Sequence, residues 1–156
     1  MKVRILIYAL LGIGAYFVNV EVQSYLGRRA FAETGLPAAP LTDTLTAAKE
    51  NNRLVLAAVS ADWCPSCRHF DEAVLTEQRV KDTILENYQF TRVDFESESG
   101  LALRKEFGIR GIPSMLVLDG EGQLVTQLTA VDDPSLFLEQ LDEVLVKKKT
   151  ANGETR

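Results

Sequence analysis

The sequence predicts an α/β domain in which a βαβ unit leads into a ββα unit, so that a mixed sheet is flanked by helices. Apolar runs of strand length alternate with stretches of helical period along most of the 156-residue chain. Two late apolar runs are separated by a short glycine-rich turn, which indicates a hairpin. The chain is 46% hydrophobic and 25% charged, as in globular proteins. It can therefore bury a core without disulfide staples.

The first half of the domain is predicted to be a short helix followed by a βαβ unit. Threonine and aspartate side chains offer N-caps for a helix over 42–52. Leu54–Val59 is a continuous apolar run, which is expected of a strand covered on both faces. A helix should begin at Pro65, since proline suits a first helical turn, and a second one should cover 77–87. Gln89–Phe95 is the next predicted strand.

The second half is predicted to be a short helix followed by a ββα unit. The helix over Leu101–Phe107 should end at the following glycine, which can adopt a left-handed conformation. Met115–Leu118 and Leu124–Leu128 are strands joined by the turn Asp119–Gly122. Pro134 opens the last helix, whose apolar residues recur with a helical period.

A basic start and an uncharged apolar run, Ile5–Val18, precede the domain. Such a pattern begins either an export signal or a single-span membrane anchor. The run, which extends to Val20 if Asn19 is tolerated, is slightly short against the ~20 residues that a spanning helix usually needs, although ~17 can suffice. The small-x-small sequence Ala30–Ala32, a candidate cleavage site, lies well beyond the run. We therefore favour an uncleaved anchor with Lys2 and Arg4 in the cytoplasm, and keep a cleaved, soluble periplasmic form as the alternative.

These patterns divide the chain into four parts. We expect a transmembrane anchor or signal over 1–20, a linker over 21–40, the folded domain over 41–148 and a disordered tail over 149–156. The linker ends in a Pro/Ala-rich stretch that favours extended conformations. The net charge is −5, and the basic residues of the first part make the remainder more acidic still. We expect no nucleic acid partner for such a surface.

Both cysteines lie in Trp63-Cys64-Pro65-Ser66-Cys67, directly after the predicted buried strand. Two thiols three positions apart at a helix start can close a disulfide and pass it to another protein. Cys64 should face the free N–H groups of the helix, which favour the thiolate. We expect Cys64 to be the exposed nucleophile and Cys67, one turn further and more buried, to resolve the mixed disulfide.

With Gly111-Ile112-Pro113-Ser114 before a later strand, this motif resembles the thioredoxin superfamily over roughly 41–147. The flanking sequences look most like the C-terminal periplasmic domain of the thiol:disulfide interchange protein DsbD. The resemblance implies a thioredoxin fold and a cis bond before Pro113, whose loop lies against the cysteines. The backbone of Ile112 would pair with the substrate chain. The implied substrate contacts are Trp63, Pro65, Ile112 and Pro113.

Two positions depart from the usual thioredoxin pattern. Ala58 stands where thioredoxins carry a buried acid that accepts the proton of the resolving thiol. Asp71, one turn beyond Cys67, matches an acidic position of the DsbD-like domain and is our candidate acceptor, although a solvated helix acid fits the pattern equally well. Ser66 stands where strong oxidants often have histidine, which favours a reductant or an exchanger of intermediate potential. Asp62 is expected to be a surface residue beside the site.

Metal sites and haem attachment are poorly supported by the sequence. Structural zinc needs four ligands, and the chain offers Cys64, Cys67 and the single histidine, His69. Haem attachment would need a histidine directly after the second cysteine, where Arg68 stands. A copper carrier would need a methionine at Asp62. We expect neither a metal nor a cofactor.

The expected function is that of an extracytoplasmic thiol:disulfide oxidoreductase of bacterial type. It would be a single-pass protein of the inner membrane with its catalytic domain facing the periplasm. There it would reduce or exchange disulfides in periplasmic proteins, with electrons from a membrane thiol donor of the DsbD type. A disulfide oxidant and a non-catalytic binding or chaperone module remain the alternatives.

Overall fold

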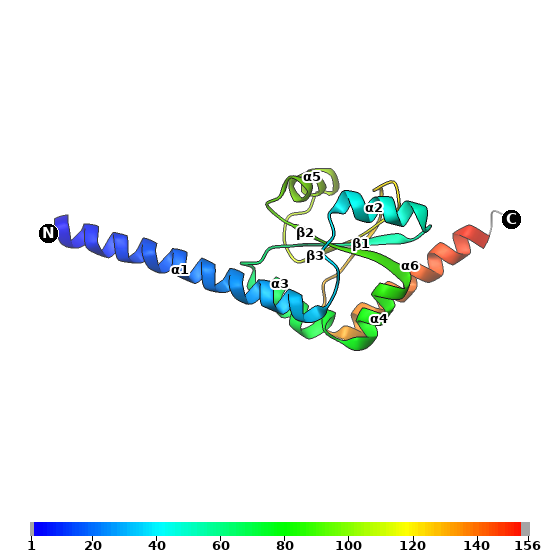
Figure 1. Ribbon diagram of the computed structural model, residues 1–156, viewed down its shortest axis with the longest axis horizontal. Coiled ribbons are helices and arrows are strands. Elements are labelled where there is room, and N and C mark those ends of the chain that lie inside the picture. Colours follow the sequence, from blue (N-terminus) through cyan, green and yellow to red (C-terminus); the bar gives the residue numbers. More distant parts are fainter. Residues whose placement is uncertain (1, 154–156) are drawn as a thin grey trace.

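A computed structural model of the chain describes residues 2–153 and consists of a long helix attached to a mixed α/β domain (Figure 1). The domain repeats the predicted order of helices and strands, so the predicted fold class is confirmed. In chain order the elements are α1 (Lys2–Thr34), α2 (Leu41–Glu50), β1 (Leu54–Ser60), α3 (Pro65–Phe70), the π-helix η1 (Asp71–Leu75), α4 (Gln78–Asn87), β2 (Tyr88–Asp94), α5 (Glu98–Phe107), β3 (Ser114–Leu118), β4 (Leu124–Leu128) and α6 (Pro134–Gly153).

The four strands form one sheet in the order β2-β1-β3-β4. β1 runs parallel to β2 and antiparallel to β3, and β3 pairs antiparallel with β4. Every residue of β1 is buried, as its apolar run predicts for a central strand. Gly108 ends α5 in the left-handed conformation with a φ of 66°, as predicted. The bond between Ile112 and Pro113 is cis, as the family resemblance implied.

Helices cover both faces of the sheet (Figure 1). Successive strand residues point to opposite faces, so β1 supplies both cores. Val55, Ala57 and Val59 pack in the cluster that includes residues of α2 and α5. On the other face, Leu56 and Ala58 pack in the cluster that includes residues of α3, η1, α4 and α6. Cys64 and Cys67 form a small cluster with Ala61, and Phe95 and Ile112, which also pack against the α2 and α5 cluster, lie against it.

Helix α1 is longer than the sequence suggested. Residues 21–34, expected to belong to a linker, continue α1, and an extended segment begins only after Gly35. The reason is packing, because Ala30 and Thr34 are buried and Phe31 stacks on Phe90 of β2 at 6.4 Å between ring centroids. The opposite end of α1 projects away from the domain (Figure 1) and exposes its apolar side chains. By length and composition this helix is able to cross a membrane.

The last helix also continues beyond its expected end. α6 extends to Gly153, where a disordered tail was expected from Lys149. Lys148 donates a hydrogen bond of 2.6 Å to the carbonyl oxygen of Asn52, which ties this part of α6 to the turn before β1. The remaining tail positions, 154–156, lie outside the described residues.

Candidate redox site

Cys64 and Cys67 form a disulfide at the start of α3, at the end of β1. Cys64 is the N-cap of the helix, and Cys67 lies within its first turn, with 5.3 Å between their Cα atoms. Cys64 is 5% exposed and Cys67 is 1% exposed. Their order of exposure agrees with the expected roles. Cys64 is less exposed than expected, because Phe95 and Ile112 pack against the two cysteines.

Two groups of the motif contact the Cys64 sulfur. The backbone N–H of Cys67 donates to Sγ at 3.2 Å, and the Ser66 hydroxyl lies 3.2 Å from the same atom. The Ser66 hydroxyl also lies 3.5 Å from the carbonyl oxygen of Ile112. The structure therefore brings the loop before Pro113 to the cysteine motif. These N–H and O–H donors would stabilise negative charge on Sγ in the reduced protein.

Trp63 and Pro65 flank Cys64 on the surface. Trp63 is 40% exposed, and its indole N–H donates to Oε2 of Glu96, in the loop after β2, at 3.1 Å. Pro65, the first residue of α3, is also exposed. Both therefore lie at the surface, where an approaching protein would meet them.

Asp71 is buried beneath the site. It is 3% exposed, so it is not a solvated helix residue. Nη1 of Arg92 binds its Oδ2 at 2.7 Å, and Nη2 of Arg92 lies 3.6 Å from Oδ1 of Asp62. Burial raises the pKa of Asp71, and the charge and hydrogen bond of Arg92 offset part of that rise. Asp62 is half-exposed and also lies 3.8 Å from Arg28, so this flanking residue is ion-paired from two sides.

Arg92 was not predicted as a site residue. It pairs in register with Ala58 on the neighbouring strand, so both side chains point to the same face of the sheet. Arg92 is therefore the strand neighbour of Ala58, the position at which thioredoxins are expected to carry a buried acid. The sequence does hold a signal, because Phe90 and Arg92 occupy the same face of one strand. A charged residue on a core-facing position calls for a buried partner.

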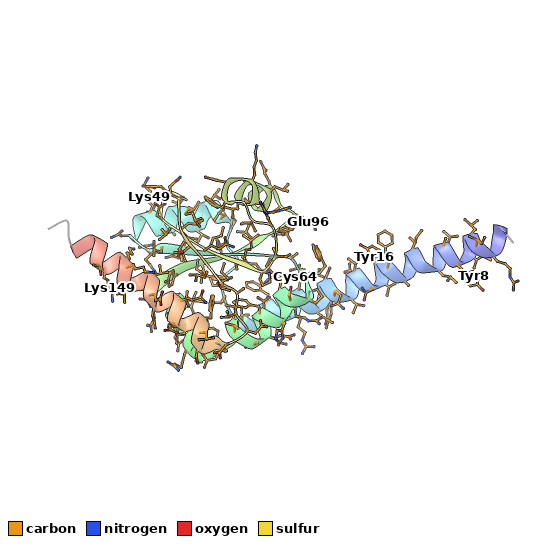
Figure 2. The ribbon with its side chains drawn as sticks, turned by 180° about the vertical axis from the view of Figure 1, so that it is seen from behind. Tyr8, Tyr16, Lys49, Cys64, Glu96 and Lys149 are labelled. Atoms are coloured by element: carbon orange, nitrogen blue, oxygen red, sulfur yellow. A yellow bond between two sulfur atoms is a disulfide. The ribbon has the colours of Figure 1, made fainter. Side chains whose placement is uncertain are left out.

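The C-terminal half of α1 packs directly on the motif (Figure 2). A Cβ atom at Gly27 would overlap the carbonyl oxygen of Asp62 and lie 2.9 Å from its carbonyl carbon, so the two backbones touch. Arg68 donates to Oε1 of Gln23 at 2.9 Å. The guanidinium of Arg92 lies 4.5 Å from the centre of the Phe31 ring. Sequence reasoning missed these contacts, which join α1 to the redox site.

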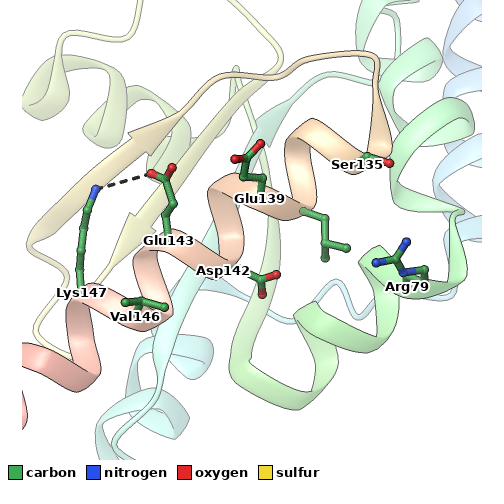
Figure 3. Close-up of a pocket in the computed structure, with 8 residues that line it drawn as sticks. Arg79, Ser135, Glu139, Asp142, Glu143, Val146 and Lys147 are labelled. Carbon is green, nitrogen blue, oxygen red and sulfur yellow. Dashed lines mark ion pairs between the residues drawn. The ribbon is translucent and has the colours of Figure 1, made fainter.

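No cluster of three or more potential metal ligands occurs within residues 2–153. His69 points to Asp132, with 3.7 Å between Nε2 and Oδ2. A hollow between α4 and α6 (Figure 3) is lined by charged side chains, including an ion pair of Lys147 and Glu143 at 3.7 Å. None of the redox residues lines it, so the cysteine motif is the candidate site.

Known proteins share this fold. A family model described as thioredoxin-like domain matches residues 41–145. The chain is 30% identical over 110 residues to the thiol:disulfide interchange protein DsbD of Actinobacillus pleuropneumoniae, a match that covers 68% of this chain and 18% of that protein. The chain thus corresponds to less than a fifth of the length of this relative.

Two solved structures give the same picture. The oxidised C-terminal domain of DsbD from Neisseria meningitidis is 27% identical with a TM-score of 0.55, over 65% of this chain and 89% of that domain. A thioredoxin from Thermus thermophilus has a TM-score of 0.65 at 23% identity, over 72% of this chain and 88% of that one, which shows the shared fold.

Proposed function

Because the chain belongs to the thioredoxin-like domain family and carries the Cys64–Cys67 pair of its disulfide oxidoreductases, we propose that it reduces or exchanges disulfides in proteins outside the bacterial cytoplasm. One observation carries this proposal. The redox-active pair opens α3 and faces the cis-proline loop at Ile112, which would hold a substrate chain. Trp63, Pro65 and Pro113 complete the proposed contact surface.

In the reducing direction, the Cys64 thiolate attacks one sulfur of a partner disulfide. The partner's S–S bond breaks, a mixed disulfide forms with Cys64, and the released partner thiolate takes up a proton. Cys67 then loses its proton and attacks Sγ of Cys64. The Cys64–Cys67 disulfide forms, and the second partner sulfur leaves as a thiolate and is protonated. Two electrons and two protons have passed to the partner.

Asp71 is the proposed proton acceptor for Cys67. Its backbone N–H bonds to the carbonyl oxygen of Cys67, so the two side chains lie one turn apart on the same helix face. Its burial raises its pKa, which makes the carboxylate a stronger base than a surface aspartate. Arg92 keeps it oriented at 2.7 Å. This arrangement would replace the acid that is absent at Ala58.

Two observations support the proposed direction and the proposed redox partners. Ser66 in place of histidine favours a reductant or an exchanger over a strong oxidant. DsbD, a relative that matches this domain, is named for thiol:disulfide interchange, which supports protein disulfides as substrates. We propose a membrane thiol donor of the DsbD type as the source of electrons.

We also propose that α1 anchors the protein in the inner membrane by a single span, with the catalytic domain in the periplasm. The apolar side chains of its first half are exposed, such as Leu10 at 60% and Phe17 at 65%, and the rest of the described chain does not bury them. Cleavage to a soluble periplasmic form is the alternative. A mature N-terminus near Glu33, read by mass spectrometry, would select that alternative.

The equilibrium potential of the Cys64–Cys67 pair against glutathione tests the direction. A value near about −270 mV, as for thioredoxin, would support a reductant, and one near about −120 mV, as for DsbA, would contradict it. Cys64→Ser tests catalysis itself. We expect it to abolish disulfide exchange, and unchanged partner binding and phenotype in this variant would favour a non-catalytic binding module.

A further inference from the structure

The relation between α1 and the cysteine motif is fixed by close contacts. Backbone meets backbone at Gly27 and Asp62, and side chains meet at Gln23 and Arg68. A helix held at these points cannot turn about its axis without breaking them. The residues one to three turns before Gly27 therefore also have defined positions relative to Cys64.

Those residues form one wall of a groove beside the disulfide. The groove has a volume of about 500 Å³ and lies between α1 and the surface made by Trp63, Pro65 and Glu96. Its α1 wall consists of Tyr16, Asn19, Val20 and Gln23.

Trp63 and Pro65 directly flank Cys64 in the chain, so the groove lies next to the cysteine motif. In the proposed exchange, a partner cysteine bound to Cys64 would sit between these residues and the Ile112 loop. Partner residues that extend past Trp63 would then reach the groove.

We propose that α1 forms one wall of the substrate groove, and that the groove binds the cysteine-bearing segment of a membrane-integral protein. The proposal rests on the anchoring and the disulfide exchange proposed above. The groove reaches Tyr16, which lies in the apolar run that α1 would place in the bilayer. Tyrosine favours the boundary between bilayer and water. A segment in this groove therefore lies at the membrane surface.

Simple helix geometry supports the same location. Val20, at the end of the apolar stretch, precedes Gly27 by seven residues, which is roughly 10 Å of helix at 1.5 Å per residue. The motif that contacts Gly27 is thus held close to the surface of the membrane. Partners whose cysteines lie just outside a spanning helix would reach it directly. The wall offers apolar groups from Tyr16 and Val20 and an amide from Asn19 to such a segment.

The test uses the full chain in vesicles of phosphatidylcholine and phosphatidylglycerol, reduced and then freed of reductant. One probe is a synthetic single-span peptide with an oxidised Cys-x-x-Cys at its outer end, and the other is oxidised glutathione. Val20→Trp fills the groove, whereas Val22→Trp places the same side chain on an exposed position outside it. Asn19→Trp is a second groove variant, at an exposed position of α1.

We expect Val20→Trp and Asn19→Trp to slow exchange with the spanning peptide at least tenfold and to change the glutathione rate less than twofold. Val22→Trp should leave both rates unchanged. Equal rates for Val20→Trp and Val22→Trp on the peptide would overturn the proposal. So would equal slowing of both probes, since the substitution would then act on the cysteines.

The occupant can be tested separately, because Trp63 is the only tryptophan of the wild-type chain. Lipids brominated along their acyl chains quench a tryptophan that they contact. If they quench Trp63 and the spanning peptide does not reverse the quenching, the groove binds lipid and the proposal is overturned. A failure of the proposed function itself looks different. In that case the wild type would exchange with neither probe, or Cys64→Ser would exchange as fast as the wild type.

Discussion

Replacing Asp71 by asparagine separates the chemical role of this residue from its structural one. Asparagine has nearly the same shape and can still accept a hydrogen bond from Arg92, 2.7 Å away. It cannot accept a proton from Cys67. A positioned general base typically accelerates a proton transfer by about 10²- to 10⁴-fold. We expect Asp71→Asn to slow the resolving attack of Cys67 within that range and to leave the first attack by Cys64 unchanged.

The stability of the variant follows from the pKa of Asp71. Burial holds this pKa above its ordinary value even with Arg92 beside it. The folded state therefore binds more protons than the unfolded state between the folded and unfolded pKa values. The free energy of unfolding of the wild type therefore falls as pH rises through that window. The total loss is at most about 1.4 kcal/mol for each pKa unit that separates the folded from the unfolded state. Because asparagine resembles the neutral carboxyl group, we expect Asp71→Asn to be at least as stable as the wild type at neutral pH.

The assay mixes reduced protein with an oxidised peptide, quenches with acid and an alkylating reagent, and follows the mixed disulfide by mass spectrometry. Asp71→Asn should accumulate the mixed disulfide. The wild-type resolving rate should also rise with pH through the pKa of Asp71, and the variant should lack this step. Glu72→Gln is the matched control, since its side chain is 53% exposed. A resolving rate within threefold of that control would refute the role of Asp71, and a large loss of stability would make it structural.

Three further substitutions test other parts of the molecule. Gly27→Ala would force α1 away from Asp62 and should lower the free energy of unfolding by about 1–3 kcal/mol. Hydrogen exchange over the C-terminal half of α1 should become faster. Gly14→Ala is the control, because open space surrounds Gly14, and it should be neutral or slightly stabilising. Phe137→Ala removes a ring that is fully buried against Phe70 and should cost about 3–5 kcal/mol in urea unfolding. A loss below about 1 kcal/mol would show that this core is not packed as described. Cys67→Ser should trap partners on Cys64, and a variant that released them at the wild-type rate would contradict the resolving role.

The elements of the domain were predictable because their signals are local. The apolar run of β1, the turn before β4 and the proline at the start of α3 each lie within a few residues, and each has the predicted structure. The cysteine pair was visible for the same reason. Its chemistry depends on the residue types and their spacing of three positions.

The parts that were missed depend on contacts between distant residues. Arg92 becomes a site residue only when β2 pairs with β1 and brings it beside Ala58. The segment 21–34 reads as a linker because its polar and small residues form no strong apolar stripe. It is a docked helix because Gly27 permits backbone contact with Asp62, a fact that no local pattern contains. Burial of Asp71 likewise depends on Arg92, 21 positions away.

The unbroken course of α1 affects how the domain would meet its partners. A flexible segment over 21–40 would let the domain wander by roughly 25 Å and face any direction. The observed helix instead runs from Lys2 through its docked end without a joint. Anchored in a bilayer, the domain would drift in two dimensions with the disulfide always at one height and one tilt. Two freely diffusing proteins lose rotational entropy when they bind, but an oriented domain would already have lost much of it in the membrane. Even a small contact surface could then sustain productive encounters.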